Sequence, residues 1–585
     1  MVSHIKEAFL LFGVALIFVQ CETDVRDGGL ALPEGFKSAV VVDSISETVR
    51  HLAVTDDHII YAKLRNANDT ASVVALQDTN GDSYADIIEK FGGQGQKERW
   101  SYATAMRIYN GYIYYSSDLV VYRQKLKKGT LIPEGDIEIV LTDDHEHGKH
   151  EHIGKPIAFD NKGHMYVPFG APSNACQQPK RTPNSPGLDP CPQLEDHAGV
   201  WRFDANKLGQ TQKDGYKYAS GIRSLVAMNW NPVDEELYGV MHGRDDLLRL
   251  WPDRYSAHES ALLPSEEFMR ITEGSHFGWP YCYYDQIKGK KVLAPEYGGD
   301  GDIVGRCSDY EDPILGFPGH WAPNDLLFYE GDQFPEHYKN GAFITFHGST
   351  NRAPYPQSGY IVGFVPFEDG KPSGDFEVFA DGFAEVDPIV NTKDAAHRPM
   401  GLAVGPDGEL YISDSVKGKI WKVSYEGDKD EFGDQQLLAM EERKNRSNVR
   451  TPDVEKDNLL PKNLIGGAKI YQQYCSACHQ MNGRGASGRF PPLTKTDWVT
   501  GDKERLIKVL LNGMEGSLKV GEEVYNGVMP QHRFLNDTEI AQVLTFVRSS
   551  FGNEASEINA DEVEKVRKRQ VESGVPIAPI QATTE

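Results

Sequence analysis

Short apolar strands alternate with polar turns along the chain from about residue 30 to residue 425. Each unit has a period-two strand, a turn rich in Gly, Asp or Asn, and a second strand with aromatic residues, which is the pattern of a β-hairpin. Examples lie at Ala105–Tyr115, Ile157–Val167, Val226–Tyr238 and Leu402–Ile412. A hairpin that repeats through this length with little helical periodicity predicts a β-propeller. An array of β-sandwiches is the competing interpretation, but it explains the similarity of the hairpins less well.

The pattern changes after residue 425. Residues 426–462 are charged and lack strand alternation, which predicts a solvated linker with a short helix. Residues 463–551 form a second unit, whose last helix has four apolar residues at i, i+3, i+4 and i+7: Ile540, Val543, Leu544 and Val547. The polar segment 552–585 predicts a loose tail. We therefore predict an all-β propeller at 30–425, followed by a small all-α domain.

The composition agrees with this division. A chain of 585 residues is too long for one ordinary domain. Its 57 Gly, 33 Pro and 10% aromatic residues suit a turn-rich β protein better than a helical one. The net charge of -25 argues against nucleic acid as a partner, because phosphate binding needs a basic surface.

The N-terminus has the pattern of an export signal, since Lys6 precedes an apolar run from Ala8 to Val19. This run is too short to span a bilayer as a mature helix. Cys21 stands where a bacterial lipoprotein is cleaved and acylated, although Phe18-Val19-Gln20 lacks the small residues usual there. Residues 1–21 thus predict a signal peptide and a periplasmic or outer-surface location in a bacterium. Membrane attachment through a lipidated Cys21 and a soluble product both stay open.

The seven cysteines fall into three groups. Cys21 belongs to the signal, and two further cysteines belong to a motif near residue 475. The four that remain predict disulfides in an exported chain, most simply as the local pairs Cys176–Cys191 and Cys282–Cys307. Buried free thiols are the alternative.

The segment Cys475-Ser-Ala-Cys478-His479 is a C-x-x-C-H motif. Two thiols at this spacing can bond covalently to one haem, and the adjacent His479 then lies against the iron. A redox disulfide or half of a zinc site would explain the two cysteines, but neither explains the histidine that follows. The motif predicts one covalent haem c.

An electron-carrying haem would take a thioether sulfur as its sixth ligand. Met529, in Val-Met-Pro before the last helix, is the predicted ligand, and a packing role is the alternative. Met514 is a weaker candidate, and Met481 is too close to His479 to reach the opposite haem face. Residues 463–551 resemble the small class I cytochromes c, in which a loop proline directs its carbonyl to the ligand histidine. The resemblance assigns that role to Pro491 or Pro492.

Residues 30–425 carry no G-x-G-x-x-G after a strand, so a nicotinamide or flavin on a Rossmann unit is not expected. Over residues 100–425 the chain resembles the soluble quinoprotein glucose dehydrogenases and sorbosone dehydrogenases, which are six-bladed propellers that bind pyrroloquinoline quinone and calcium. The matching segments are His152–Tyr166, Gly221–Arg223, His242–Asp246, Phe277–Pro280, Gly341–Arg352 and Ala396–Leu402.

The resemblance implies roles for individual residues. His152 falls at the position of the general base, and Arg223 at that of a quinone-binding arginine, although the following residue is Ser224 where the family has Asn. The backbone carbonyls of Gly243 and Arg244 would bind calcium. The quinone carboxylates would be bound by two further arginines, Arg352 and Arg398.

One position departs from the family. The glucose dehydrogenases hold the base with an Asp at the end of the next strand, where this chain has Phe169-Gly-Ala171. Either Glu151 or Asn174 orients His152, or the assignment of the base is wrong. Two other motifs allow a metal site: the histidines between His145 and His152, and the acidic turn Asp78–Asp86. A solvated loop is the favoured interpretation of the first, and an Asx-rich turn explains the second equally well.

Together these features predict a quinohaemoprotein dehydrogenase that oxidises a sugar, either an aldose or a keto-aldose. The covalent haem would pass electrons to an external acceptor such as another cytochrome. The alternative is a non-catalytic propeller that binds a carbohydrate or a protein and carries an electron-transfer cytochrome.

Overall fold

The computed structural model describes residues 25–46, 48–66, 71–93, 105–145, 151–452, 462–480, 483–521, 523–572 and 578–581. The predicted signal peptide with Cys21, and the residues Met481, His147 and His150, lie outside this part of the chain. Within it, no helix is both long and apolar enough to cross a membrane.

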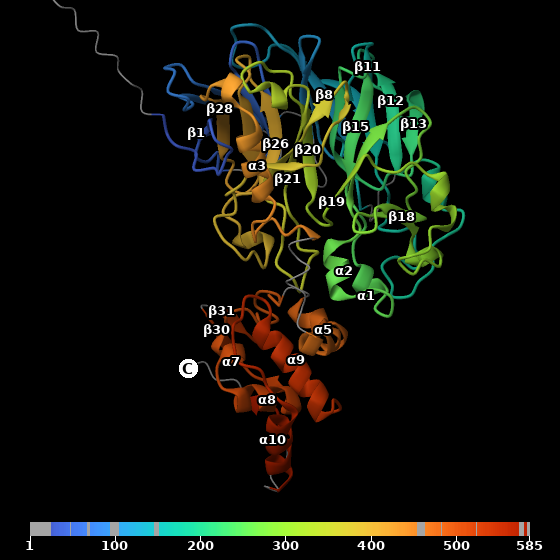
Figure 1. The fold of residues 1–585 in the computed structure, drawn as a ribbon, viewed down its shortest axis with the longest axis vertical. Coiled ribbons are helices and arrows are strands. Elements are labelled where there is room, and N and C mark those ends of the chain that lie inside the picture. The colour runs from blue at the N-terminus through green and yellow to red at the C-terminus, as the bar shows by residue number, and fades with distance from the viewer. Residues whose placement is uncertain are drawn as a thin grey trace, which may run out of the picture.

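Six four-stranded antiparallel sheets form the blades of a propeller, which confirms the prediction (Figure 1). The first three blades are β2 Val49–Val54, β3 Ile60–Leu64, β4 Ala71–Gln77 and β5 Ile87–Gly92; β6 Met106–Tyr109, β7 Tyr112–Ser116, β8 Val120–Lys125 and β9 Glu138–Thr142; β10 Ala158–Phe159, β11 His164–Phe169, β12 Gly199–Asp204 and β13 Tyr216–Ser220.

The other three blades follow the same order. They are β14 Leu225–Asn231, β15 Glu236–Met241, β16 Glu266–Ile271 and β19 Leu315–Phe317; β20 Pro323–Phe328, β21 Ala342–Phe346, β22 Ile361–Val365 and β25 Glu377–Ala380; β26 Pro399–Val404, β27 Leu410–Asp414, β28 Ile420–Tyr425 and β1 Phe36–Val42.

The last blade closes the ring, because its outer strand comes from the beginning of the chain. Strand β1 pairs with β28 from Phe36 opposite Tyr425 to Val42 opposite Ile420. The ring of Phe36 also packs edge-on against Phe334, Tyr338 and Phe379, with centroid distances of 4.8, 5.2 and 5.0 Å. Backbone pairing and aromatic packing together hold the N-terminal strand in the blade.

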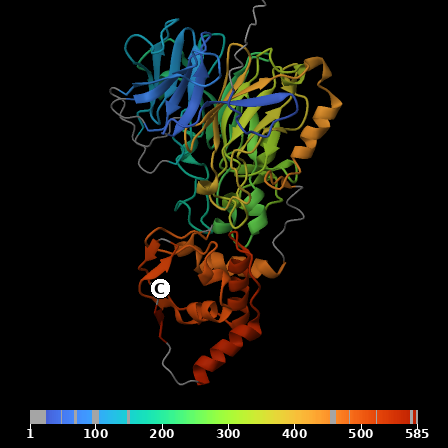
Figure 2. The same ribbon diagram turned by 90° about the vertical axis from the view of Figure 1, so that its left-hand side faces the viewer.

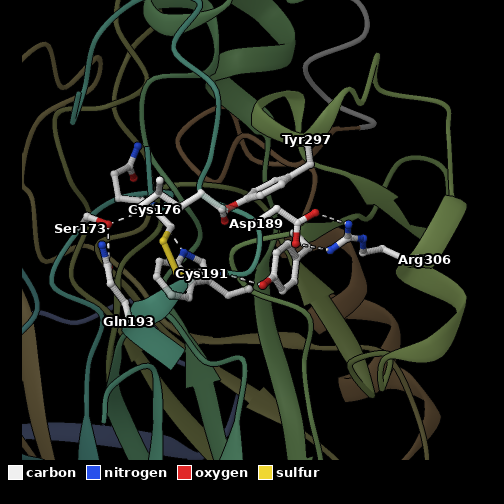
Figure 3. The surroundings of a disulfide bond; sticks show 11 residues. Ser173, Cys176, Asp189, Cys191, Gln193, Tyr297 and Arg306 are labelled. Carbon is white, nitrogen blue, oxygen red and sulfur yellow. Dashed lines mark hydrogen bonds and ion pairs between the residues drawn. A yellow bond between two sulfur atoms is a disulfide. The ribbon is translucent and has the colours of Figure 1, made fainter. Parts of the chain in front are cut away.

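Long loops cover one end of the propeller. They include α1 Leu247–Leu250, α2 Ala257–Leu262, the small hairpin β17 Cys282–Asp285 with β18 Lys290–Leu293, and both disulfides. The bonds join Cys176 to Cys191 and Cys282 to Cys307, as the sequence predicted. An ion pair between Asp189 and Arg306 connects the two bonded loops (Figure 3). These loops therefore form one cross-linked cover.

The prediction of a solvated linker at 426–462 is wrong for its first part. Helix α3, Asp434–Arg443, packs against β25, and Met440 is buried. Further along, Val449 joins the apolar core between blades, and Arg443 donates to the carbonyls of Ala31 and Phe379. Many residues of this segment are charged and only a few side chains are buried, so its sequence resembles that of a linker. Only residues 453–461 lie outside the described part of the chain.

The C-terminal domain is helical, as predicted. Its helices are α5 Lys462–Tyr474, α6 Ser476–His479, α7 Asp497–Thr500, α8 Lys503–Asn512, α9 Asp537–Ser549 and α10 Ala560–Glu572. The prediction of a loose tail after residue 551 is wrong, because α10 packs on α8 and α9 through buried Val563 and Val566. Two small two-stranded sheets complete the domain: β29 Met514–Glu515 with β32 Ile580–Gln581, and β30 Leu518–Val520 with β31 Glu523–Tyr525.

The helical domain lies at the end of the propeller that carries α1 and α2 (Figures 1 and 2). The contact uses the loop between β25 and β26. Asp394 of this loop forms an ion pair with Arg484, and Val390 packs against the apolar core of the helical domain. A short loop of the propeller thus contacts the segment that follows His479.

Replacing Phe36 with Ala should destabilise the propeller by about 3–5 kcal/mol, because the ring is buried among aromatic side chains at the closure of the ring. Denaturant unfolding followed by far-UV circular dichroism measures this loss. Val233→Ala, at an exposed turn, is the control and should change stability by less than about 0.5 kcal/mol. Equal stability of the two variants would show that β1 does not hold the ring closed.

Candidate functional site

Charged side chains converge on the loop-covered end of the propeller. In each blade the start of the first strand and the end of the second lie side by side, because the two strands form an antiparallel hairpin. Arg50 lies near the start of β2, and Arg398 directly precedes β26. His242 directly follows β15, and His347 directly follows β21. With Arg65, which follows β3, we call these five residues the cationic mouth.

Burial and neighbouring positive charges lower the pKa values of two groups in the cationic mouth. Burial lowers the pKa of His347 well below its usual value, and Arg398, Arg50 and Arg65 lower it further. Burial also lowers the pKa of Arg398 to about 10, and Arg65 adds to this shift. Arginine charges that lower the pKa of neighbouring groups in a partly buried site favour the binding of an anion.

Arg398 is well placed in this group. Its Nε donates to the carbonyl of His347 at 2.9 Å, and its guanidinium lies 5.6 Å from the centre of the Tyr360 ring. Its Nη2 also donates to the carbonyl of Gly348, and the side chain is only partly buried. The carboxylate-binding role that the family resemblance implies for Arg398 stays a prediction.

Arg223 is placed differently. It is buried, and its guanidinium donates to the Asn174 side chain at 2.9 Å, to the Gly243 carbonyl at 2.8 Å and to Asp245 at 2.9 Å. These protein acceptors occupy it, so its evident role is to position Asp245 and the carbonyl of Gly243. Contact with a quinone stays a prediction for Arg223.

Arg352 is fully enclosed, with 0% of its surface exposed. Its Nη1 donates to the carbonyl of Ala261 at 2.9 Å, and its Nε to that of Pro356 at 3.0 Å. These bonds tie the loop after β21 to α2. The structure therefore gives Arg352 a structural role instead of the ligand contact predicted from the sequence.

The predicted calcium segment has oxygen donors beside it. The carboxylate of Asp245 is 21% exposed, and the Arg223, His320 and Arg181 side chains hold its pKa below the usual value although burial acts to raise it. Burial raises the pKa of nearby Glu266 to about 8, and Asp245 contributes. The side chain of Arg244 points elsewhere, into a buried ion pair with Glu296. A cation beside Asp245 would stabilise both carboxylates, so the donor set fits calcium.

His152 is held by the main chain. Its Nδ1 donates to the carbonyl of Ala171 at 2.7 Å, which leaves Nε2 as the basic nitrogen of that tautomer. Gly170 allows this approach, because a Cβ there would lie 2.3 Å from the His152 carbonyl oxygen. Neither side chain proposed from the sequence orients the imidazole: Glu151 binds Arg181, and Asn174 binds Arg223.

Electrostatic interactions connect His152 to the cationic mouth. The carboxylate of Asp245 interacts with His152, and His242 interacts with both Asp245 and Arg50. Asn351 donates to Asp245 at 2.7 Å. Sequence reasoning did not identify Arg50, Arg65, Asp245 or Asn351 as site residues. The position of Arg50 at the start of a first strand, like that of Arg398, was the available signal.

The helical domain contains an apolar pocket that encloses about 1230 Å³, including the part open to solvent. Cys475, Cys478 and His479 line one wall. The Nδ1 of His479 donates to the carbonyl of Pro491 at 3.0 Å, as the resemblance to cytochromes implied. The other ring nitrogen is thereby left as a metal ligand, so the residues fit a covalent haem.

Met529 and Met514 lie together on the pocket wall. Their backbones form two hydrogen bonds, from Met514 N to Met529 O at 3.0 Å and from Met529 N to Met514 O at 2.8 Å. The structure brings both candidate thioethers to the pocket, and the choice of Met529 as the ligand stays a prediction. His532 also lines the pocket and was missed from the sequence.

The two other metal motifs do not form sites in the described residues. The carboxylate of Asp78 accepts the backbone amides of Asn80, Gly81 and Ser83, which is an Asx-rich turn. His145 donates from Nδ1 to Asp143 at 2.8 Å and stacks near His197. His147 and His150 lie outside the described residues, so a metal site there stays untested.

Residues 33–426 match the model of the TrAA12-like family, and residues 465–551 match that of cytochrome c. The propeller fold is similar to a calcium structure of Trichoderma reesei Carbohydrate-Active Enzymes Family AA12, with a TM-score of 0.54, 18% identity, and coverage of 68% of this chain and 98% of that one. It is also similar to the holo form of the pyranose dehydrogenase PQQ domain from Coprinopsis cinerea, with a TM-score of 0.53, 16% identity, and coverage of 68% and 100%.

Among curated proteins, cytochrome c-552 of Thermus thermophilus is 40% identical over 114 residues, which cover 18% of this chain and 86% of that protein. An uncharacterized protein of Borreliella burgdorferi is 28% identical over 210 residues, or 36% of this chain. The chain spans 48% of the length of the Borreliella protein.

These matches confirm the resemblance inferred from the sequence for both parts of the molecule. Through its propeller the chain belongs to the TrAA12-like family, and it carries a cytochrome c domain at its C-terminal end.

Proposed function

We propose that this chain is an exported quinohaemoprotein dehydrogenase that oxidises a sugar, an aldose or a keto-aldose, in its propeller. The observation that carries the proposal is the cationic mouth beside His152, on the face of the propeller that contacts the cytochrome domain. The family membership and the PQQ domain named for the Coprinopsis structure support an oxidoreductase of this kind.

When bound, pyrroloquinoline quinone would supply a two-electron acceptor for a sugar hydroxyl, and haem c would supply a one-electron carrier. Arg398, Arg50 and Arg65 would bind the carboxylates of the quinone, because their charges act together on His347 at the same end of the propeller. Calcium would be bound beside Asp245, by the carbonyls of Gly243 and Arg244 that the family resemblance implies.

His152 would act as the general base. A sugar hydroxyl loses its proton as its carbon is oxidised, and a neutral imidazole can accept that proton. The bond to the Ala171 carbonyl fixes the tautomer in which Nε2 is basic. Asp245 lies close enough to stabilise the imidazolium that forms.

The cytochrome domain would receive electrons from the propeller that holds it. Arg484 lies five residues after His479, and its ion pair with Asp394 fixes this segment against the propeller loop. Since the domains share one chain, the cytochrome is present at a high effective concentration. Electrons would leave to an external acceptor such as another cytochrome.

Reconstituting the full-length haem-containing protein with the quinone and calcium, followed by a screen of aldoses with a dye acceptor, tests the proposed activity. His152→Ala should lower turnover by about 10²–10⁴-fold, because the base is lost. It should still bind the quinone, because the arginines of the cationic mouth are unchanged.

Failure of the wild-type protein to oxidise any aldose or keto-aldose would favour the non-catalytic alternative, a propeller that binds a carbohydrate or a protein. Nearly normal turnover by His152→Ala on a verified substrate would overturn the assignment of the base. The search would then move to His242 or His347, which also lie in the cationic mouth.

Met529→Ala should convert a low-spin haem to a high-spin one, because the strong-field sulfur ligand is lost. The haem should remain attached after denaturation, because thioether bonds from Cys475 and Cys478 hold it. Absorption spectra of the two oxidation states measure the change. Met514→Ala is the matched control and should keep the low-spin spectrum; the reverse pattern would assign the sixth ligand to Met514.

Asp394→Asn should weaken the contact between the domains, because it removes the charge that pairs with Arg484. A partly exposed ion pair contributes up to about 1 kcal/mol, so the equilibrium constant for docking should fall by up to about fivefold. Sugar-driven haem reduction should slow relative to dye reduction, and hydrogen exchange in residues 389–396 should rise.

Asp387→Asn is the control for this experiment. Asp387 lies in the same loop, but its ion pair with Arg450 is internal to the propeller. Haem reduction that is equally slow in both variants would show that the loss of a loop charge, and not of the contact, is responsible.

A further inference from the structure

Three metal-ligating side chains meet on the face of the propeller opposite the cationic mouth. His58 lies in the turn between β2 and β3, and Asp407 lies in the equivalent turn between β26 and β27, shortly before Glu409. Their ligand atoms all lie within 4.8 Å of one another. The two turns belong to the first and the last blade, so the cluster bridges the seam where the ring closes.

The strongest indication that a cation binds here is the carboxylate of Glu409. The residue is 4% exposed, and its Oε2 is buried without a hydrogen-bond partner. The other oxygen, Oε1, accepts from the Tyr411 hydroxyl at 3.0 Å. In the described part of the chain, Glu409 forms no ion pair with a lysine or an arginine. A buried carboxylate oxygen without a donor is costly, and a cation at this oxygen removes the cost.

The other two side chains complete a ligand set. The Nδ1 of His58 and the Oδ2 of Asp407 are 3.9 Å apart, which is too long for a hydrogen bond. Zinc binds imidazole and carboxylate atoms at about 2.0–2.2 Å, so two ligands of one tetrahedral ion lie about 3.4 Å apart, and this pair would need to close by about 0.5 Å. Both side chains are mostly exposed, at 51% and 71%, and can adjust to an ion.

The surroundings favour a cation. The carboxylates of Asp407 and Glu409 both lie at this turn, beside the imidazole of His58. The negative charges are thus concentrated at this turn. One imidazole with two carboxylates suits zinc better than calcium, because calcium is bound by oxygen atoms alone.

We propose that His58, Asp407 and Glu409 bind one zinc ion, which connects the first blade to the last. Water occupies the fourth position. This site lies far from the proposed chemistry in the direction of the strands, and its role is to hold the ring closed.

Isothermal titration of zinc chloride into the EDTA-treated full-length haem-containing protein tests the site. Glu409→Gln and His58→Gln should each lower the affinity of one zinc site by at least about tenfold, since each removes a ligand. Both should also lose a zinc-dependent rise in the thermal unfolding temperature. Calcium chloride should not displace the zinc, and dye-linked sugar oxidation should be unchanged.

His164→Gln is the matched control. His164 lies in the equivalent hairpin of the third blade, with Nδ1 2.7 Å from Asp160, but no third ligand from the described part of the chain accompanies this pair. It should keep the zinc site. His58 is exposed, so its variant will fold even if Glu409→Gln does not. Unchanged zinc binding in His58→Gln, or equal loss in His164→Gln, would overturn the proposal.

Discussion

The pairing of β1 with β28 is the constraint on which the rest of the molecule depends. The side chains of the cationic mouth come from four blades, the first, fourth, fifth and sixth, so they meet only when the blades form a closed ring. The N-terminal strand closes that ring across almost four hundred residues of sequence. Folding of this kind pays a large entropic cost before its long-range contacts form, and the aromatic cluster around Phe36 helps to offset it.

Closure also divides the propeller into two faces with different chemistry. One face has long loops, two disulfides and the cationic mouth, and it contacts the cytochrome domain. The other has short turns, and its buried carboxylate lies at the seam between blades. The strands separate the two faces, so the loops on the first can vary in length without altering the turns on the second.

The sequence predicted those structural features that residues close together in the chain determine. The periodicity of the hairpins predicted the propeller, and the C-x-x-C-H motif predicted the haem site. The short separation of the cysteines along the chain predicted both disulfides. It missed features that depend on a few distant contacts. Helix α10 buries Val563 and Val566 in an otherwise polar segment, and residues 426–452 are anchored by buried Met440 and Val449.

The sequence predicted several residues of the candidate site, but it predicted the roles of those residues less well. A backbone carbonyl orients His152, and no side-chain motif encodes a main-chain acceptor. Arg223 and Arg352 look like ligand-binding arginines in the sequence, yet their partners are carbonyls and side chains of loops that fold over them. Arg50 belongs to the mouth only because the ring brings the first blade beside the last.

The loop between β25 and β26 has one further consequence. Asp394 touches the cytochrome domain, and Arg398, four residues later, lies in the cationic mouth. Four residues span at most about 14 Å of extended chain, so the two contacts are mechanically joined by a very short tether. A displacement of the cytochrome domain would therefore pull directly on an arginine of the cationic mouth. The state of one domain could be sensed by the other without any motion of the blades.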